Sequence, residues 1–286
     1  MTSYASYTTL KCELDDDGVL IVLLNRPDKM NSLDEAMVTE LGEAMMSAAG
    51  DTGVRCVLIT GEGRAFSAGR DISSAKPDED AYEIIAEHVN PMLAMIYHCP
   101  KPTVSAVNGP AMGVGLGIAL ACDIVIAADN ARMSSPFARL GVALDSGGHY
   151  FLPRLVGYNR AMEMVYTSDI IRGKQAAAWG LVNRSVPGTR LRDRSLELAR
   201  RIATGPVNAF MAEKAFMRQA ETMSYDQVCA AEAKLQDSLM GSPEYGEGLA
   251  AFTAKRVPQF RGIPLRLDPV SARPSRPDPG RVRGRP

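Results

Sequence analysis

The chain has 286 residues and a net charge of −1, with 46% hydrophobic and 23% charged residues. This balance is typical of a globular protein with a sizeable core, and the near-zero charge gives no reason to expect nucleic acid or an anionic membrane as a partner. No basic segment followed by an apolar run opens the chain, and no apolar run reaches the roughly 18 residues of a membrane span, so we expect a cytoplasmic protein. The five cysteines are scattered without a Cys-x-x-Cys pair, which favours reduced thiols over disulfides.

Four apolar runs of strand length predict strands that are covered on both faces. They span residues 19–24, 54–59, 103–107 and 124–127. Helical patterns lie between them, over residues 32–49, 80–98 and 113–122. Ser32, with Glu35 three residues later, is predicted to cap the first of these helices. After Ser134 helical periods dominate, so a strand-rich first half should be followed by a helical last third.

Three regions are predicted along the chain: a core over residues 1–204, a helical region over 205–262 and a tail over 263–286. The tail has almost no large apolar side chains, so it cannot bury enough surface to offset chain entropy and should be disordered. From Pro264 onward it holds six prolines, six arginines and two aspartates, a net charge of +4. Binding of an acidic partner would explain that charge, but an inert extension is the favoured interpretation.

Three segments carry glycines where an ordinary helix or strand disfavours them, at residues 61–71, 108–117 and 144–148. Tight turns would explain them, and so would a backbone that approaches a ligand closely. The second segment follows a predicted strand and opens a helix, which directs free backbone N–H groups at whatever lies there. Ile118 stands where a dinucleotide-binding motif needs its third glycine, so that motif fails. The backbone N–H groups of this segment would suit either a phosphate or a developing oxyanion as ligand.

Asp145 is the acidic residue of the third segment and has two interpretations. An aspartate before Ser-Gly-Gly is a common helix N-cap, which would be favoured in an arbitrary protein, and a carboxylate in such a loop is also a candidate acid or base. His149 lies four residues later, but the Gly-x-Ser-x-Gly motif of a hydrolase triad is absent. Together with His88 and His98 it matches none of the usual ligand spacings, so no metal site is predicted.

Several segments together resemble the crotonase superfamily, the enoyl-CoA hydratases and isomerases. The similar segments are residues 24–33 (an N-terminal signature), 66–72 and 102–123 (two oxyanion loops), 177–182 and 251–256. The resemblance covers about residues 18–260. It implies an α/β fold, a spiral of ββα units with a helical C-terminal region, assembled as a homotrimer or as a hexamer. Residues 205–262 would then be the trimerisation region.

The resemblance also implies a site for an acyl-CoA thioester. Its carbonyl oxygen would meet the backbone N–H groups of Arg70 and Val114, which stabilise an enolate at a helix N-terminus. Since these donors are backbone groups, their side chains are expected to be free to vary. Coenzyme A is part of the substrate, so no separate cofactor is expected. Substrate contacts are implied for Arg26, Lys29, Met30, Ala68, Asp71 and Ile72, and for Phe252 and Lys255, which would reach a neighbouring subunit's ligand.

Two positions depart from the family's hydratases, which carry glutamates where this chain has Gly117 and Phe137. Water addition needs one group to activate water and another to protonate the α-carbon, so ordinary hydration is not expected. Residues 140–148 instead resemble the loop of enoyl-CoA isomerases, including the ring-opening isomerase of phenylacetate breakdown, in which one aspartate works alone. That residue is Asp145 here, acting in an apolar pocket to which Phe137 contributes.

The sequence therefore predicts an enoyl-CoA isomerase of fatty-acid or aromatic-acid catabolism. A non-catalytic acyl-CoA binder or carrier is the alternative from another class, and a hydratase with atypical catalytic residues is the third. An aroyl-CoA dehalogenase also has an aspartate at this position, but the His and Trp that it uses are replaced here by Asn90 and Phe137.

Overall fold

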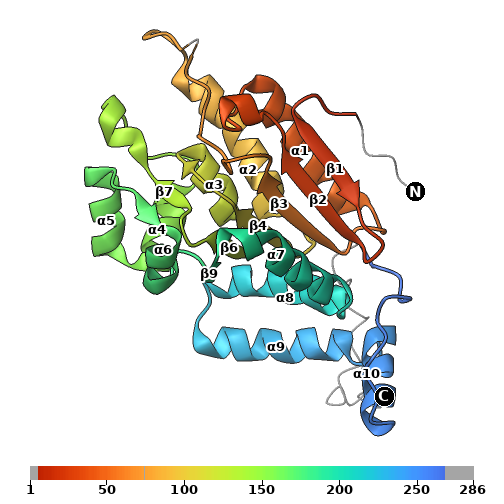
Figure 1. Cartoon of the computed structure of the whole chain (residues 1–286). Coiled ribbons are helices and arrows are strands. Elements are labelled where there is room, and N and C mark those ends of the chain that lie inside the picture. The colour runs from red at the N-terminus through yellow and green to blue at the C-terminus, as the bar shows by residue number, and fades with distance from the viewer. Residues whose placement is uncertain (1–5, 74, 268–286) are drawn as a thin grey trace, which may run out of the picture. The chain divides into compact units, whose positions relative to one another are not determined.

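The computed structural model describes residues 6–73 and 75–267. Contacts divide the chain after Thr204 into two compact units, and each is described by itself. The first unit contains the sheets and the second is helical, which confirms the predicted α/β class with a helical C-terminal region (Figure 1). No helix among the described residues is long and apolar enough to cross a membrane.

A six-stranded sheet forms the centre of the first unit. Its strands lie in the order β1 (Leu10–Leu14), β2 (Val19–Leu24), β3 (Cys56–Gly61), β4 (Thr103–Val107), β6 (Ile124–Ala128) and β9 (Arg184–Val186). β1 pairs antiparallel with β2, and the following neighbours pair in parallel. All residues of β4 are buried, as expected for a parallel strand with both faces covered.

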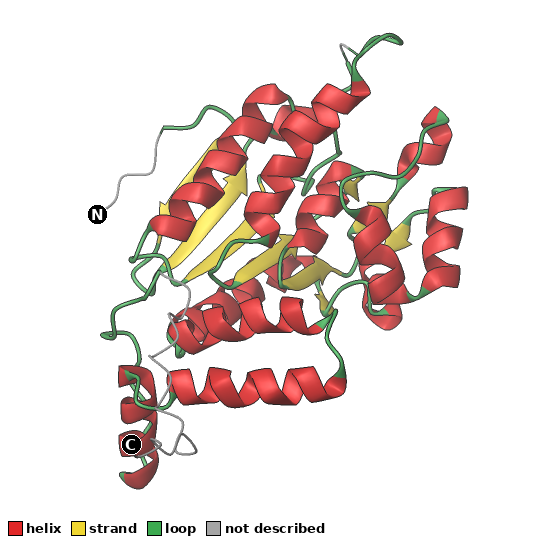
Figure 2. Cartoon of the chain, turned by 180° about the vertical axis from the view of Figure 1, so that it is seen from behind, coloured by secondary structure: helices red, strands yellow, loops and turns green. Residues whose placement is uncertain are grey.

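Helices cover both faces of this sheet, as the two opposite views show (Figures 1 and 2). On one face lie α1 (Glu35–Gly50), α2 (Asn90–Tyr97) and α3 (Val114–Ala121). On the other face α7 (Gly188–Ala203) packs across β2, β3, β4 and β6. Its buried side chains include Leu191 and Leu198, which repeat at helical spacing.

The first helix begins later than the sequence indicated. Its N-cap is Asp34, whose carboxylate accepts a hydrogen bond from the Met37 amide at 2.9 Å. The predicted capping box of Ser32 with Glu35 is therefore wrong. The reason is tertiary: Leu33 pairs with Arg70 in an isolated bridge, which holds the chain extended for one more residue.

The predicted helix over residues 80–98 is divided in two. A π-helical stretch (Glu83–Val89) precedes α2, and Pro91 lies in the first turn of α2. Proline has no backbone N–H to donate to the preceding turn, so regular α-helical hydrogen bonding cannot run through this point.

A second, small sheet and several short helices complete the first unit. The sheet has the order β5 (Ala111–Met112), β7 (Arg132–Ser134) and β8 (Ile171–Arg172). The helices are η1 (Pro27–Lys29), η3 (Pro136–Leu140), α4 (Gly148–Val156), α5 (Tyr158–Thr167) and α6 (Gly173–Trp179).

The second unit contains α8 (Val207–Ala220), α9 (Tyr225–Leu239) and α10 (Pro243–Thr253). Buried Glu244 of α10 accepts hydrogen bonds from the Asn208 amide at 3.0 Å and the Ala209 amide at 3.1 Å, and so joins α10 to the start of α8. The first residues of the predicted tail are described: the Arg266 amide donates to Asn208 Oδ1 at 2.7 Å. Residues 268–286 of that tail lie outside the described residues.

Candidate active site

The first and second glycine-rich segments lie directly against each other. Ser67 and Ala111 form a parallel bridge. The Ser67 amide donates to the Pro110 carbonyl at 2.9 Å, and the Met112 amide donates to the Ser67 carbonyl at 3.0 Å. Segments that are far apart in the sequence are thereby fixed side by side.

Two glycines permit this close approach. A Cβ at Gly69, where φ is +95°, would lie 2.8 Å from the Met112 carbonyl oxygen. A Cβ at Gly115 would lie 2.6 Å from the Ser67 carbonyl oxygen. Both distances are too short for a real side chain, so glycine is required at both positions, each next to one of the predicted oxyanion donors.

The two predicted donors, the amides of Arg70 and Val114, make no hydrogen bond to any described part of the protein. The residues on either side of Arg70 make the hydrogen bonds to the neighbouring segment. The Leu33 amide donates to the Gly69 carbonyl and the Asp71 amide donates to the Leu33 carbonyl, each at 2.8 Å. Val114 is the first residue of α3, where N–H groups have no partner within the helix. Both amides are therefore available to a ligand oxygen, one of them at the positive end of a helix.

Asp145 is half-buried in the loop before α4. The Ser146 hydroxyl donates a hydrogen bond to its Oδ1 at 2.5 Å. The N-cap of α4 is Gly147, and no side chain caps this helix. The interpretation of Asp145 as a plain helix cap is therefore wrong, because the carboxylate bonds the hydroxyl of the next residue instead.

The surroundings of the Asp145 carboxyl act on its protonation in opposite directions. Burial raises its pKa above the ordinary value, whereas the Ser146 hydrogen bond and the positive charges of Arg70 and His149 hold the rise in check. The Arg70 guanidinium also pairs with Glu79 at 2.8 Å. The side chain of Arg70 therefore affects the site electrostatically, contrary to the expectation that it is free to vary.

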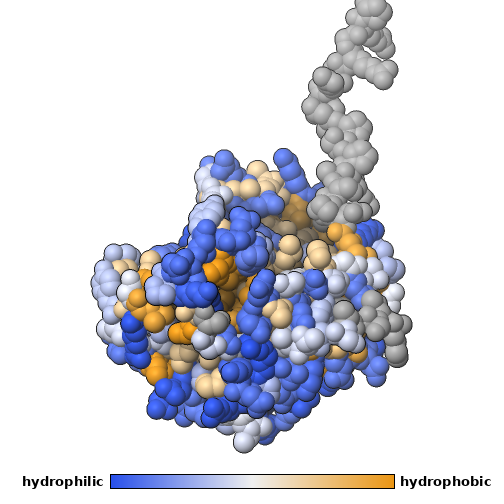
Figure 3. Space-filling model, turned by 90° about the horizontal axis from the view of Figure 1, so that it is seen from above, coloured by the Kyte–Doolittle hydropathy of each residue, from blue (hydrophilic) through white to orange (hydrophobic). Residues whose placement is uncertain are grey.

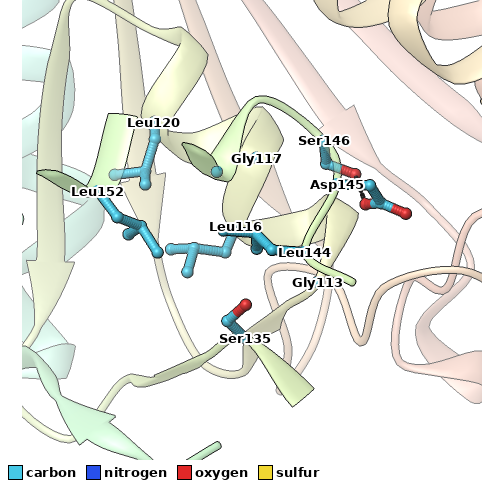
Figure 4. Close-up of a pocket in the computed structure, with 10 residues that line it drawn as sticks. Gly113, Leu116, Gly117, Leu120, Ser135, Leu144, Asp145, Ser146 and Leu152 are labelled. Atoms are coloured by element: carbon cyan, nitrogen blue, oxygen red, sulfur yellow. Dashed lines mark hydrogen bonds between the residues drawn. The ribbon is translucent and has the colours of Figure 1, made fainter. Parts of the chain in front are cut away.

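A pocket lies between α3, α4 and the loop that carries Asp145 (Figure 4). Its walls are mostly leucine side chains and glycine backbone, and it is lined by Gly113, Leu116, Gly117, Leu120, Ser135, Leu144, Asp145, Ser146, Gly148 and Leu152. In Figure 4 the Asp145 carboxylate points away from the leucines, while Ser135 directs its hydroxyl toward them. The ionisable group thus lies at the edge of an apolar pocket.

The outer surface near these loops is also apolar. Seen from above, the molecule has a hollow in which hydrophobic residues gather (Figure 3). Ile72, Leu140 and Val142 are each more than half exposed, at 53%, 61% and 55%. They belong to the orange and lime-green segments at the upper end of the first unit in Figure 1.

The two positions at which hydratases of the family carry glutamates serve packing here. A Cβ at Gly117 would lie 2.5 Å from the Ser146 carbonyl oxygen, so the loop with Asp145 fills the space that a glutamate would need. Phe137 is partly buried, and its ring faces Gly113, where an added Cβ would lie 3.6 Å from ring carbon Cζ. An aromatic ring therefore lies beside the residue that precedes the second donor.

Arg26 and Asp71, both predicted substrate contacts, are engaged with each other. The Arg26 guanidinium lies 3.2 Å from an Asp71 carboxylate oxygen and 3.1 Å from one of Asp34, and donates to the Ser32 carbonyl at 2.6 Å. Hydrogen bonds from Ser73, and then the contact with Arg26, lower the pKa of Asp71 to about 2. This cluster fixes the chain around the first donor.

Four other predicted contacts lie near the same loop. Lys29 is exposed at the end of η1, and Met30 follows it with φ +53°. The Ala68 amide donates to the Met30 carbonyl at 2.9 Å, which joins the two segments. Ile72 is 53% exposed beyond the first donor. The structure thus gathers these residues around Arg70, and their contact with substrate stays a prediction.

Phe252 and Lys255 lie in the second unit. Phe252 is 84% exposed near the end of α10, an unusual exposure for a large aromatic side chain. Lys255 is exposed with φ +53°. Their predicted contact with a neighbouring subunit's ligand stays a prediction.

Two polar residues of the pocket, Ser135 and Ser146, were not predicted from the sequence. Ser146 could have been noticed, since a hydroxyl beside a candidate acid often hydrogen-bonds it. Ser135 carries no such signal, because only the fold places it opposite the leucines of α3 and α4.

Comparisons with known proteins bear on this geometry. The family model for enoyl-CoA hydratase/isomerase matches residues 15–263. The chain is 38% identical over 258 residues to a Rhodobacter capsulatus protein named "Probable enoyl-CoA hydratase", with 90% of this chain and 99% of the relative covered. It is 36% identical over 252 residues to the 1,2-epoxyphenylacetyl-CoA isomerase of Escherichia coli, with 86% and 96% covered.

A solved structure gives the same result for the fold. The enoyl-CoA hydratase of Bacillus anthracis superposes with a TM-score of 0.85 at 29% identity, over 89% of this chain and 100% of that one. This likeness over nearly the whole chain confirms the fold expected from the sequence. The relatives' names cover both hydration and isomerisation, so the reaction has to be inferred from the site.

Proposed function

The chain belongs to the enoyl-CoA hydratase/isomerase family, and from that premise we propose that it is an enoyl-CoA isomerase of fatty-acid or aromatic-acid catabolism. One observation carries the proposal: among the described residues that line the pocket, Asp145 is the one ionisable group. Isomerisation needs a single group that takes and returns a proton, whereas hydration needs two.

In the proposed reaction the thioester oxygen of a 3-enoyl-CoA accepts hydrogen bonds from the Arg70 and Val114 amides. The Asp145 carboxylate removes a proton from the carbon between the carbonyl and the double bond, and negative charge moves onto the thioester oxygen. The protonated Asp145 then returns the proton to the far end of the dienolate, which gives the 2-enoyl-CoA. The amides contribute most where charge develops, and removal of one such donor typically costs about 3 kcal/mol of barrier.

The raised pKa of Asp145 suits this role. Burial raises the pKa of the Asp145 carboxyl and so makes the carboxylate a stronger base, while the hydrogen bond from the Ser146 hydroxyl and the charge of Arg70 limit the rise. A general base works best when its pKa lies near the working pH. The leucine side chains that line the pocket give it an apolar wall, and an apolar site that holds little water disfavours hydration of the product.

A non-catalytic acyl-CoA binder is the second candidate. The observation that favours it is the direction of the Asp145 carboxylate, which points away from the leucines of the pocket (Figure 4). A binder would hold acyl-CoA thioesters without converting them.

Assembly as a homotrimer or hexamer belongs to the same proposal, and light scattering on the purified full chain tests it. The cytoplasmic location stays a prediction.

A turnover screen of the purified protein separates the candidates. The substrates are 3-enoyl-, 2-enoyl- and aromatic acyl-CoAs, and the products are identified by mass and by NMR. An isomerase converts a 3-enoyl-CoA into a 2-enoyl-CoA of the same mass, and a hydratase adds the mass of water to a 2-enoyl-CoA. Binding of every acyl-CoA without conversion of any would refute the isomerase.

A further inference from the structure

The side chain of Arg70 is paired with Glu79, which lies nine residues further along the chain. The Arg70 guanidinium lies 2.8 Å from a Glu79 carboxylate oxygen, and the two side chains are 41% and 25% exposed. An ion pair that solvent reaches this readily contributes little to the stability of a fold. Its main effect is therefore expected on the site beside it.

The backbones of both partners are held independently of the ion pair. Arg70 forms a bridge with Leu33, which joins two segments of the first unit. Glu79 immediately precedes Asp80, whose carboxylate accepts a hydrogen bond from the Glu83 amide at 3.0 Å at the start of the π-helical stretch. The ion pair thus connects two anchored segments, and it sets the direction of the long Arg70 side chain.

The Arg70 guanidinium also acts on Asp145. Burial raises the pKa of the Asp145 carboxyl and the positive charge of Arg70 opposes this rise, so the two groups lie close enough to interact through space. The Asp145 carboxylate nevertheless accepts its hydrogen bond from Ser146, and the guanidinium is paired with Glu79. The other charge that acts on Asp145 among the described residues is that of His149, in the first turn of α4.

A direct ion pair between Arg70 and Asp145 would impair a catalytic base. An arginine beside an aspartate stabilises the ionised carboxylate and so weakens its hold on a proton. The guanidinium would also occupy carboxylate oxygens that must come within hydrogen-bond reach of the substrate's proton. Figure 4 shows the Asp145 carboxylate turned away from the leucines of the pocket, so the pocket does not shield it from such a contact.

We propose that Glu79 is a positioning residue of the reaction, which holds the Arg70 guanidinium away from Asp145 and so leaves that carboxylate free to take the substrate's proton. The inference rests on the proposed function in that Asp145 acts as the base. Arg70 then has two separate effects, since its backbone amide faces the thioester oxygen while its side chain is kept from the base.

Removal of the negative charge at Glu79 tests the inference. In a crystal structure of Glu79→Gln, the Arg70 guanidinium should lie within about 4 Å of the Asp145 carboxylate, as in an ion pair. The acidic limb of the kcat–pH profile for a 3-enoyl-CoA should move to lower pH, because the paired carboxylate binds its proton less tightly. Near neutral pH kcat should fall about tenfold, a part of the roughly 10²- to 10⁴-fold that a general base contributes.

Two further variants separate this effect from a general loss of negative charge. Glu83→Gln removes a carboxylate at an exposed position of the π-helical stretch and should leave the profile and kcat unchanged. Arg70→Met removes the guanidinium but keeps the backbone donor, so the acidic limb should move to higher pH. Glu79→Gln added to Arg70→Met should then cause no further change, since Glu79 acts through Arg70.

The inference is overturned if Glu79→Gln keeps the wild-type limb and kcat, or if it changes them equally in the Arg70→Met background. An Arg70 guanidinium that stays more than about 4 Å from Asp145 in the structure of Glu79→Gln also contradicts it. If the wild-type protein converts no 3-enoyl-CoA, the proposed function fails, and that crystal structure alone decides whether Glu79 holds Arg70 away from Asp145.

Discussion

Replacement of Gly117 by alanine should disturb catalysis through the loop that holds Asp145. The added Cβ would lie 2.5 Å from the Ser146 carbonyl oxygen and 2.8 Å from the Ser146 Cβ. Real Cβ contacts essentially never fall below 3.0 Å, so the loop must retreat by at least about 0.5 Å. A misplacement of about 1 Å can cost roughly 100-fold in rate, so we expect kcat to fall about tenfold.

The same contact should lower stability. Overpacking of a tight interior typically costs about 1–3 kcal/mol, so the free energy of unfolding should fall by about that amount. Urea unfolding measures this loss, and steady-state turnover of a 3-enoyl-CoA measures kcat. Gly117→Glu, which restores the residue type of the hydratases, should not create hydration activity, because its side chain meets the same backbone.

Gly50→Ala provides the control for this prediction. Gly50 ends α1, and a Cβ added there meets nothing within 4 Å. This variant should keep wild-type kcat and equal or slightly higher stability. If Gly117→Ala matched Gly50→Ala in both measurements, the proposed packing of α3 against the Asp145 loop would be refuted.

Three further predictions concern other hydrogen bonds of the chain. In Ser146→Gly the backbone can keep its φ of +54°, but the hydroxyl that stabilises the ionised Asp145 carboxylate is lost. The pKa of Asp145 should therefore rise, and the acidic limb of the kcat–pH profile should move to higher pH. An acidic limb at the wild-type pH would contradict this. Asp71 has its pKa lowered from 3.8 to about 2, so its stabilisation is present above about pH 4 and is lost toward pH 2. The difference in melting temperature between wild type and Asp71→Asn should therefore shrink as the pH falls from about 4 to about 2. A difference that stays constant over this pH range would contradict the prediction. Glu244→Ala leaves the amides of Asn208 and Ala209 without their acceptor and should cost about 1–3 kcal/mol in urea unfolding, unlike the exposed control Glu232→Ala.

The strands could be predicted because burial on both faces leaves a direct mark on the sequence. The runs at residues 19–24 and 103–107 coincide with β2 and β4, and local composition alone suffices for such strands. The start of α1 could not be predicted in this way. It depends on the bridge between Leu33 and Arg70, which joins segments far apart in the chain.

The site was predictable to a similar degree. Glycines that let two backbones meet are visible in the sequence, as at Gly69 and Gly115, and the structure gives the reason for each. The charge that Arg70 places near Asp145 was not predictable, because it depends on where a long side chain lies in the fold. The Ser135 hydroxyl, which has no hydrogen-bond partner among the described residues, was not predictable for the same reason.

Turnover by Asp145→Asn tests the central claim most directly. Asparagine keeps the size of the side chain but cannot take a proton, and general acid–base catalysis contributes about 10²- to 10⁴-fold. We predict that kcat for a 3-enoyl-CoA falls by at least about 100-fold, while the affinity for hexanoyl-CoA changes by less than about threefold, since Asp145 acts on the proton and not on binding. A variant that binds normally and keeps kcat within a few-fold of wild type would contradict the assignment of Asp145 as the acid and base.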